Sequence, residues 1–147
     1  MNDFTKILAG TATLAVLGVG IAFAQSPPSP PTAAVTWQEF SGYKRYHGNC
    51  SVCHGPDGLG GTFAPSLVNS LKAVDHDAFM EVVVNGKENM QLAMPSFGAD
   101  PNVMCYIEDI YAYLKARSDG RVGRGRPAPQ PAKPADVAAA ETACMGG

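Results

Sequence analysis

The run Cys50-Ser51-Val52-Cys53-His54 decides how the rest of this chain is interpreted. Two cysteines separated by two residues and followed at once by a histidine are typical of covalent haem attachment. One turn of backbone presents both thiols to neighbouring vinyl groups of a porphyrin, and the imidazole then lies beneath the iron. The run therefore predicts one covalent haem c bound through Cys50 and Cys53, with His54 as the proximal iron ligand.

Three other roles compete for this run. A zinc site needs a second Cys or His pair at ligand spacing, but the remaining cysteines, Cys105 and Cys144, stand alone and far apart. A redox dithiol follows a strand of a βαβ unit, whereas this pair follows a predicted helix. A local structural disulfide leaves His54 and the downstream methionines unexplained. Haem attachment is therefore favoured.

The start of the chain has the features of an export signal. Lys6 precedes an apolar run from Ile7 to Phe23, which ends on the small-x-small pattern Ala22-Phe23-Ala24. An uncleaved anchor helix is the alternative, but the run is short for a membrane span. We expect residues 1–24 to be a cleaved signal peptide, the chain's one association with a membrane, and the mature protein to be periplasmic.

The remaining 123 residues of the 147 suit one domain with extensions. Residues 25–35 are rich in proline and predict an extended linker. Residues 36–118 are the predicted domain, and residues 119–147 are a tail rich in Arg and Pro. The net charge of −2 argues against a nucleic-acid binder and supplies no large field to steer a charged partner.

Helical signals bracket the haem run on both sides. Thr36 and Glu39 predict a capping box for a helix that ends near His47, with Gly48 as its stop. A stripe of apolar residues over 101–117 predicts the last helix of the domain. Shorter helices are expected from Asp75 or Asp77 to Asn85-Gly86, and over 135–143.

Gly42 lies in the middle of the first predicted helix, where glycine costs about 1 kcal/mol relative to alanine. This cost suggests that another helix crosses closely there. The predicted helix over 101–117 is the expected partner. His47 is expected to be a helix-end side chain and His76 a surface residue.

The second axial ligand of the iron, and any group that orients the His54 ring, must come from other segments of the chain. The carbonyl of Pro65 could accept a hydrogen bond from Nδ1 of His54 and so fix the ring, although a proline in a turn is an equally good interpretation. Met94, in a loop and followed by proline, is the expected distal iron ligand. Met90 and Met104 are rivals, and packing is the usual role of methionine. With both axial positions filled, the iron carries electrons and catalyses nothing.

These residues together resemble the monohaem class I cytochromes c. Gly42, Tyr46, the haem run, Gly55-Pro56-Asp57-Gly58, Pro65, Met94-Pro95 and Ile110-Tyr111-Ala112-Tyr113-Leu114 stand in that family's order from about Trp37 to Lys115. The resemblance implies an all-α fold with about three main helices around one haem. It implies an electron carrier rather than an enzyme.

Shorter strings resemble the methanol-metabolism-related cytochromes c more narrowly. They are Gly42–His47, Cys53–Gly60, Asn102–Tyr106, Asp109–Tyr111 and Arg124–Pro127. This resemblance implies a monomeric shuttle that takes electrons from a pyrroloquinoline-quinone (PQQ) alcohol dehydrogenase, such as a lanthanide-dependent methanol dehydrogenase, and passes them to another cytochrome or oxidase. A donor to an oxidase in another pathway, a peroxidase or gas sensor with an open sixth position, and a haem module of a larger complex remain alternatives.

Two features of the tail stay open. Cys105 and Cys144 could form a disulfide in an oxidising compartment, or could remain two unpaired thiols. The arginines at 117, 121, 124 and 126 could dock on an acidic dehydrogenase surface, but a solvated charge run is the default interpretation.

Overall fold

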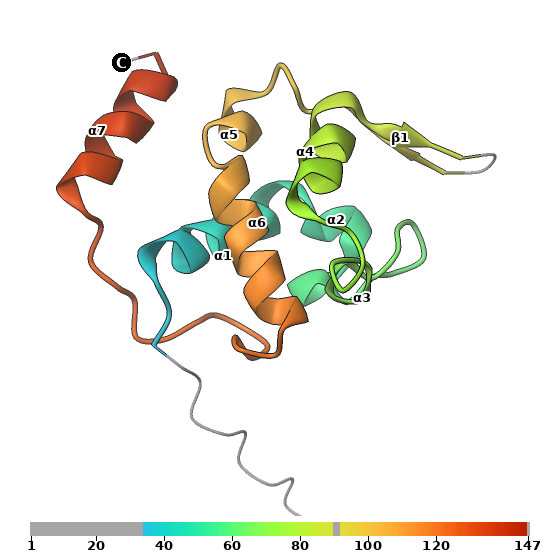
Figure 1. Cartoon of the computed structure of the whole chain (residues 1–147), viewed down its shortest axis with the longest axis horizontal. Coiled ribbons are helices and arrows are strands. Elements are labelled where there is room, and N and C mark those ends of the chain that lie inside the picture. Colours follow the sequence, from blue (N-terminus) through green and yellow to red (C-terminus); the bar gives the residue numbers. More distant parts are fainter. Residues whose placement is uncertain (1–33, 90–91, 147) are drawn as a thin grey trace, which may run out of the picture.

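The computed structural model describes residues 34–89 and 92–146. The predicted signal peptide, residues 1–24, and residues 25–33 of the predicted linker lie outside the described residues. The elements along the described chain are α1 (Trp37–Asn49), α2 (Ser51–His54), the 3-10 turn η1 (Pro56–Gly58), α3 (Leu67–Ser70), α4 (His76–Asn85), β1 (Lys87–Glu88), β2 (Ala93–Met94), α5 (Pro101–Met104), α6 (Ile107–Ser118) and α7 (Ala135–Cys144) (Figure 1).

The described fold is all-α apart from one small hairpin. Strands β1 and β2 pair antiparallel, with Lys87 opposite Met94, and the sequence did not predict them. Of the helices at 34–89 and 92–146, none has the length and apolar character that crossing a bilayer requires. The expectation of an all-α domain is confirmed.

Helix α1 begins at the predicted capping box. The side chain of Thr36 accepts from the Glu39 backbone N–H at 3.2 Å, and the Thr36 N–H donates to the Glu39 carboxylate at 2.9 Å. The predicted stop at Gly48 is wrong by two positions, because the helix includes Gly48 and ends at Asn49. A methyl group at Gly48 would meet nothing within 4 Å, so this glycine has no packing role.

Helices α1 and α6 cross at the centre of the molecule (Figure 1). The closest approach is at Gly42, where a Cβ atom would lie 1.9 Å from the backbone oxygen of Asp109 and 2.8 Å from the Cβ of Tyr113. The close crossing predicted from Gly42 is therefore confirmed. Around it the core gathers large buried side chains, among them Phe40, Tyr46, Val103, Ile110, Tyr113 and Leu114.

The single helix predicted over residues 101–117 is broken into α5 and α6. At the break, Tyr106 adopts a φ of −132°, and its N–H donates to the carbonyl of Val103, three residues back, at 3.0 Å. The ring of Tyr106 is buried, with the guanidinium carbon of Arg45 3.5 Å from its centre. Its neighbour Cys105 is bonded to the tail. Periodicity did not reveal the break because the apolar positions continue through it.

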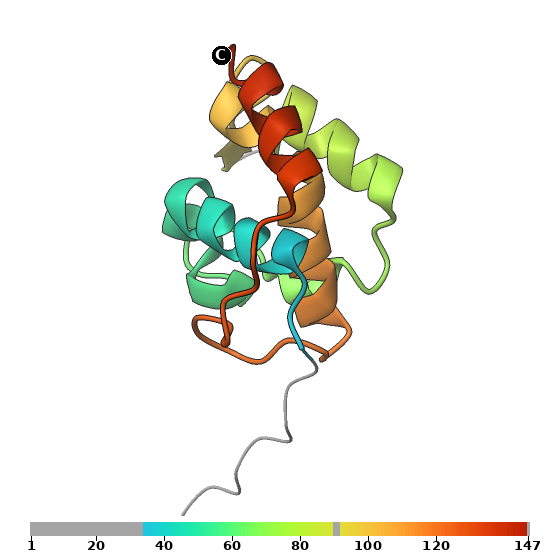
Figure 2. The same ribbon diagram turned by 90° about the vertical axis from the view of Figure 1, so that its left-hand side faces the viewer.

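After α6, the tail passes the N-terminal end of α1 and then continues into α7 (Figures 1 and 2). A disulfide between Cys105 and Cys144, with Cα atoms 5.7 Å apart, joins the end of α7 to the α5–α6 corner. The prediction of a short tail helix is confirmed, although α7 buries none of its side chains. The disulfide settles the alternative that the sequence left open.

Candidate functional site

The haem run occupies the corner between α1 and α2. Cys50 is both the C-cap residue of α1 and the N-cap residue of α2. Cys50 is half-buried, whereas Cys53 is exposed. Burial, followed by the nearby Cys53 thiol, raises the pKa of Cys50 to about 11. An unmodified Cys50 thiol in this fold is therefore protonated near neutral pH and a poor nucleophile.

His54 is buried at the end of α2 with a defined ring orientation. Its Nδ1 lies 3.0 Å from the carbonyl oxygen of Pro65. A carbonyl only accepts, so Nδ1 carries the hydrogen and Nε2 of the neutral ring keeps its lone pair. The hydrogen bond predicted for Pro65 is present. Nε2 is the nitrogen that could ligate iron, and the bond at Nδ1 would raise its basicity.

The hydroxyl group of Tyr46 holds the loop that follows His54. Tyr46 is fully buried; its hydroxyl donates to the Gly55 carbonyl at 2.5 Å and accepts from the Gly58 N–H at 3.0 Å. Burial, above all, raises the pKa of Tyr46 well beyond its ordinary value, so the phenol stays protonated and keeps donating. Gly60 closes the loop: its φ is +84°, and a Cβ there would lie 2.6 Å from the Ser66 nitrogen.

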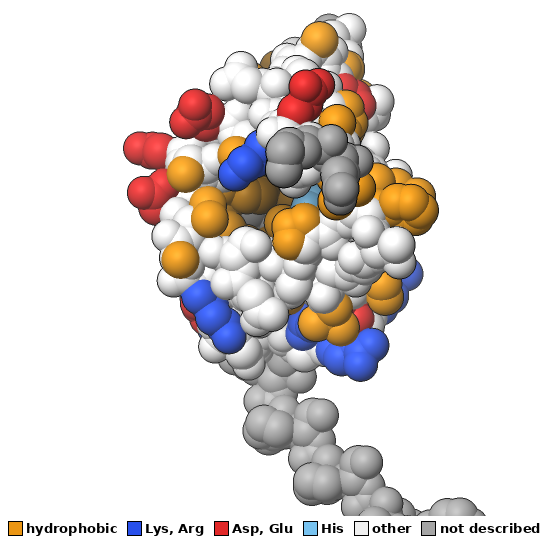
Figure 3. Space-filling view, turned by 90° about the vertical axis from the view of Figure 1, so that its right-hand side faces the viewer, with side chains coloured by type: hydrophobic (Ala, Val, Ile, Leu, Met, Phe, Trp, Pro, Cys, Tyr) orange, Lys and Arg blue, Asp and Glu red, His pale blue; other side chains and the backbone are white. Residues whose placement is uncertain are grey.

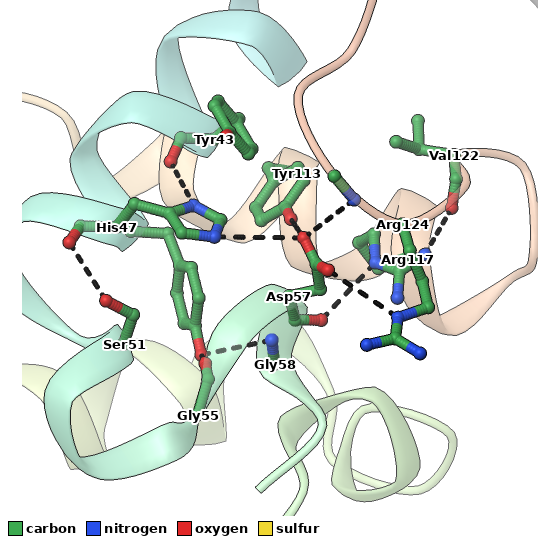
Figure 4. A network of polar contacts seen from close by, with 12 residues as sticks. Tyr43, His47, Ser51, Gly55, Asp57, Gly58, Tyr113, Arg117, Val122 and Arg124 are labelled. Carbon is green, nitrogen blue, oxygen red and sulfur yellow. Dashed lines mark hydrogen bonds and ion pairs between the residues drawn. The ribbon is translucent and has the colours of Figure 1, made fainter.

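Asp57 is a buried carboxylate that the sequence did not single out (Figure 4). Its Oδ1 accepts from the Tyr113 hydroxyl at 3.3 Å and from the Gly125 N–H at 3.1 Å. His47 Nε2 lies 3.7 Å from the same oxygen, and Arg124 Nε lies 3.8 Å from Oδ2. This carboxylate therefore joins α1, α6 and the tail. The turn residues at 55–58 signalled a loop but not the buried charge.

The sequence favoured a solvated charge run for the arginines at 117, 121, 124 and 126, and this holds for the last three, which are exposed, but not for Arg117. Arg117 is buried and donates to the backbone oxygens of Asp57 at 3.3 Å and Val122 at 2.8 Å. Arg121 forms an ion pair with Glu39, whose carboxylate is buried at the start of α1. The expectation is wrong for Arg117, because its hydrogen bonds offset the cost of burying the charge.

The segment that carries Met94 is hydrogen-bonded to the C-terminal end of α4. Phe97 and Gly98 donate their N–H groups to the carbonyls of Val83 and Val84 at 3.0 and 3.1 Å. The hydroxyl of Ser96 also donates to the Val84 carbonyl, at 2.5 Å. Met94 itself is half-buried and packs against the core.

The rival methionines are placed differently. Met104 belongs to the short helix α5, where its partly buried side chain packs against the core. Met90 lies outside the described residues.

A hollow opens on the face shown in Figure 3, with hydrophobic side chains in its walls and a histidine side chain at its edge. Several large apolar residues are unusually exposed: Val52 at 81%, Phe63 at 65%, Leu92 at 42% and Leu59 at 40%. An apolar hollow, two thiols one turn apart and a buried imidazole with a free lone pair fit a covalently held haem. The donor set and its surroundings are therefore compatible with the predicted cofactor.

Comparisons with known proteins agree with this geometry. A family model described as cytochrome c oxidase, cbb3-type, subunit III matches residues 39–114. Cytochrome c-553I of Paracoccus denitrificans is 48% identical over 118 residues, which cover 78% of this chain and 52% of that protein. This chain thus spans about half the length of that relative. Cytochrome c-555 of Methylococcus capsulatus (Bath) is 41% identical over 123 residues, covering 84% of this chain and 94% of that one.

A solved structure has the same fold. It is the crystal structure of the c-type cytochrome XoxG from Methylobacterium extorquens AM1, with a TM-score of 0.73 and 46% identity. The match covers 76% of this chain and 69% of that one.

The chain belongs to the c-type cytochromes, with the all-α fold of the class I monohaem group. It binds one haem c covalently and is an electron carrier. The narrower resemblance, to the methanol-metabolism-related cytochromes c, is also confirmed by these relatives.

Proposed function

We propose that Cys50 and Cys53 hold the haem, that His54 is the proximal iron ligand with Pro65 orienting its ring, and that Met94 is the distal ligand. The observation that carries this assignment is the hydrogen bond between His54 Nδ1 and the Pro65 carbonyl, which leaves Nε2 as the coordinating nitrogen. Haem c supplies an iron that accepts and releases one electron. A thioether on the distal side favours the ferrous state and raises the reduction potential.

The residues of this chain do three things for that chemistry. The α1–α2 corner places both sulfurs one turn apart on a rigid element. The loop that Tyr46 holds keeps the proximal side ordered through two hydrogen bonds. The segment hydrogen-bonded to α4 presents Met94, and with both axial positions filled the iron would have no open site for a reactant.

Spectroscopy of matched methionine variants tests the ligand set. Met94→Leu keeps a similar volume but removes the sulfur, so the ferric protein should lose its weak far-red sulfur-to-iron band and bind cyanide rapidly. The ferrous form of the same variant should bind carbon monoxide rapidly. Met104→Leu is the control, because Met104 packs against the core and should keep the band. Retention of the band in Met94→Leu would sink the distal assignment and favour a peroxidase or gas sensor.

We further propose that the protein works in the periplasm and accepts electrons from a PQQ-dependent alcohol dehydrogenase, such as a methanol dehydrogenase, for transfer to a cytochrome or oxidase. The similarity to XoxG supports this proposal, together with the short strings that resemble the methanol-metabolism-related cytochromes c. The export-signal pattern at residues 1–24 supports the compartment.

A reduction assay tests the donor. The oxidised cytochrome is mixed with the purified alcohol dehydrogenase of the same organism and its alcohol, and the haem absorption is followed by stopped flow. Reduction should occur within each turnover and stop when the alcohol is withheld. Full activity of the dehydrogenase in a periplasmic extract that lacks this cytochrome would contradict the proposal.

A second carrier function has one observation in its favour. The matching family model describes a subunit of a cbb3-type oxidase, which is compatible with a donor to an oxidase or a haem module of a larger complex. Sizing the protein in a periplasmic extract separates these cases. Elution at the size of the single chain favours the diffusible carrier, and co-elution with oxidase subunits favours the module.

A further inference from the structure

Residues 121–125, which we call the strap, cross from the end of α6 to the loop that follows His54. The strap is held at three points. Arg121 pairs with Glu39, the carbonyl of Val122 accepts from Arg117 at 2.8 Å, and the Gly125 N–H donates to Asp57 Oδ1 at 3.1 Å. Val122 is 2% exposed, so the strap also contributes to the core. It is an integral part of the folded domain.

Asp57, the point where the strap meets the loop, has a backbone conformation that needs support. Its φ is +57°, in the left-handed region that a residue with a side chain rarely adopts. Its carboxylate is buried and therefore depends on its hydrogen-bond donors and cations. The strap supplies the Gly125 N–H and the Arg124 guanidinium, while α6 supplies the Tyr113 hydroxyl (Figure 4).

A short series of contacts leads from Asp57 to the proximal histidine. The next residue, Gly58, donates its N–H to Tyr46 and accepts at its carbonyl from the Ser66 hydroxyl at 3.2 Å. Ser66 follows Pro65, whose carbonyl accepts from His54 Nδ1 at 3.0 Å. Four residues, Asp57, Gly58, Ser66 and Pro65, therefore connect the strap to the imidazole of His54.

We propose that the strap is a positioning element for the proximal ligand and so helps to set the reduction potential of the haem. This inference rests on the proposed function, because it requires His54 to be the iron ligand. With the strap in place, Pro65 stays in line with Nδ1 and the imidazole is a more basic ligand, which favours the ferric state and lowers the potential. Loosening the strap weakens that hydrogen bond and raises the potential.

A purely electrostatic role for the strap predicts the opposite sign. Its arginines are cations, and removing a cation near a haem stabilises the ferric state and lowers the potential. The sign of the shift therefore separates positioning from charge.

The test compares two double variants of the full-length holoprotein that lose the same charge. Arg121→Gln/Arg124→Gln removes the ion pairs of the strap with Glu39 and Asp57. The control, Arg126→Gln/Lys133→Gln, removes two tail cations that contact Gln130, Glu141 and aromatic rings instead. The readouts are the reduction potential from a spectroscopic titration and, by NMR of the ferrous protein, the exchange rate of the His54 Nδ1 hydrogen with water.

Positioning predicts a higher potential and faster exchange of the Nδ1 hydrogen in the strap variant, with an unchanged or lower potential in the control. A strap variant whose potential falls, or whose potential and exchange rate both match wild type, overturns the proposal. If the strap double variant does not fold, the single variant Arg124→Gln takes its place with Arg126→Gln as control.

The failure of the proposed function is seen separately. A wild-type spectrum without histidine coordination speaks against the ligand assignment itself. An intact low-spin wild-type spectrum, combined with no effect of the strap variants, speaks against the strap alone.

Discussion

Replacing Gly42 by alanine tests the packing on which the haem-binding corner is built. The added methyl group would lie 1.9 Å from the backbone oxygen of Asp109, 2.5 Å from its carbon and 2.8 Å from the Cβ of Tyr113. Two of these three atoms are main chain, so no side-chain rotation relieves the overlap. Helices α1 and α6 would have to separate by about 1.5 Å to restore an ordinary van der Waals contact, in a core packed as densely as an organic crystal.

The magnitude follows from two opposing terms. Overpacking a core costs about 1–3 kcal/mol and occasionally more, and this site stands at the upper end because backbone must move. Alanine recovers about 1 kcal/mol of helix propensity. We expect Gly42→Ala to lower the free energy of unfolding by about 2 kcal/mol or more, which moves the urea midpoint by roughly 1 M.

Gly48 is the matched control, because it lies in the same helix and a methyl group there would meet nothing within 4 Å. Gly48→Ala should stabilise the protein by about 0.5–1 kcal/mol. Both variants are measured as holoproteins by urea unfolding followed with far-ultraviolet circular dichroism. Equal stability of Gly42→Ala and wild type would refute the argument that the crossing requires a glycine.

Three further predictions concern contacts away from this crossing. Tyr46→Phe leaves the Gly58 N–H and the Gly55 carbonyl without the buried hydroxyl, so the free energy of unfolding in urea should fall by about 1–3 kcal/mol. Cys144→Ser removes a disulfide between residues 39 positions apart, which is worth about 4 kcal/mol in the chain-entropy model. Because α7 buries no side chain, the measured loss of unfolding free energy should be smaller, and proteolysis should start in the tail. For His76, hydrogen bonds to Glu108 and then Asp77 raise the pKa above its ordinary value of 6.5, so the stability advantage of wild type over His76→Gln should shrink as pH rises through the raised pKa.

The sign of the His76 prediction follows from linkage. A folded-state pKa above the ordinary value means that the protonated ring stabilises the folded protein fully below about pH 6.5, and that this contribution disappears as pH rises through the raised pKa. An advantage that grows with pH would contradict the assignment. For Tyr46→Phe, an unchanged urea midpoint would contradict the stabilising role of the buried hydroxyl. For Cys144→Ser, proteolysis that starts within α1 or α6 would contradict the expectation that the tail is released first.

Local signals in the sequence were sufficient to predict the haem run, the capping box of α1, the close helix crossing at Gly42 and the tail helix. Each of these depends on residues within one or two helical turns, or on a glycine whose cost needs a reason. The class I resemblance supplied the order of the helices. These features required no knowledge of which distant segments meet.

Only the tertiary structure decided the break between α5 and α6, the disulfide of Cys105 and the burial of Asp57 and Arg117. Each depends on the proximity of residues far apart in the chain: Asp57 meets Tyr113 and Gly125, and Cys105 meets Cys144. A charged residue in a turn looks solvated in the sequence, because its desolvation and its partners exist only after the chain has folded.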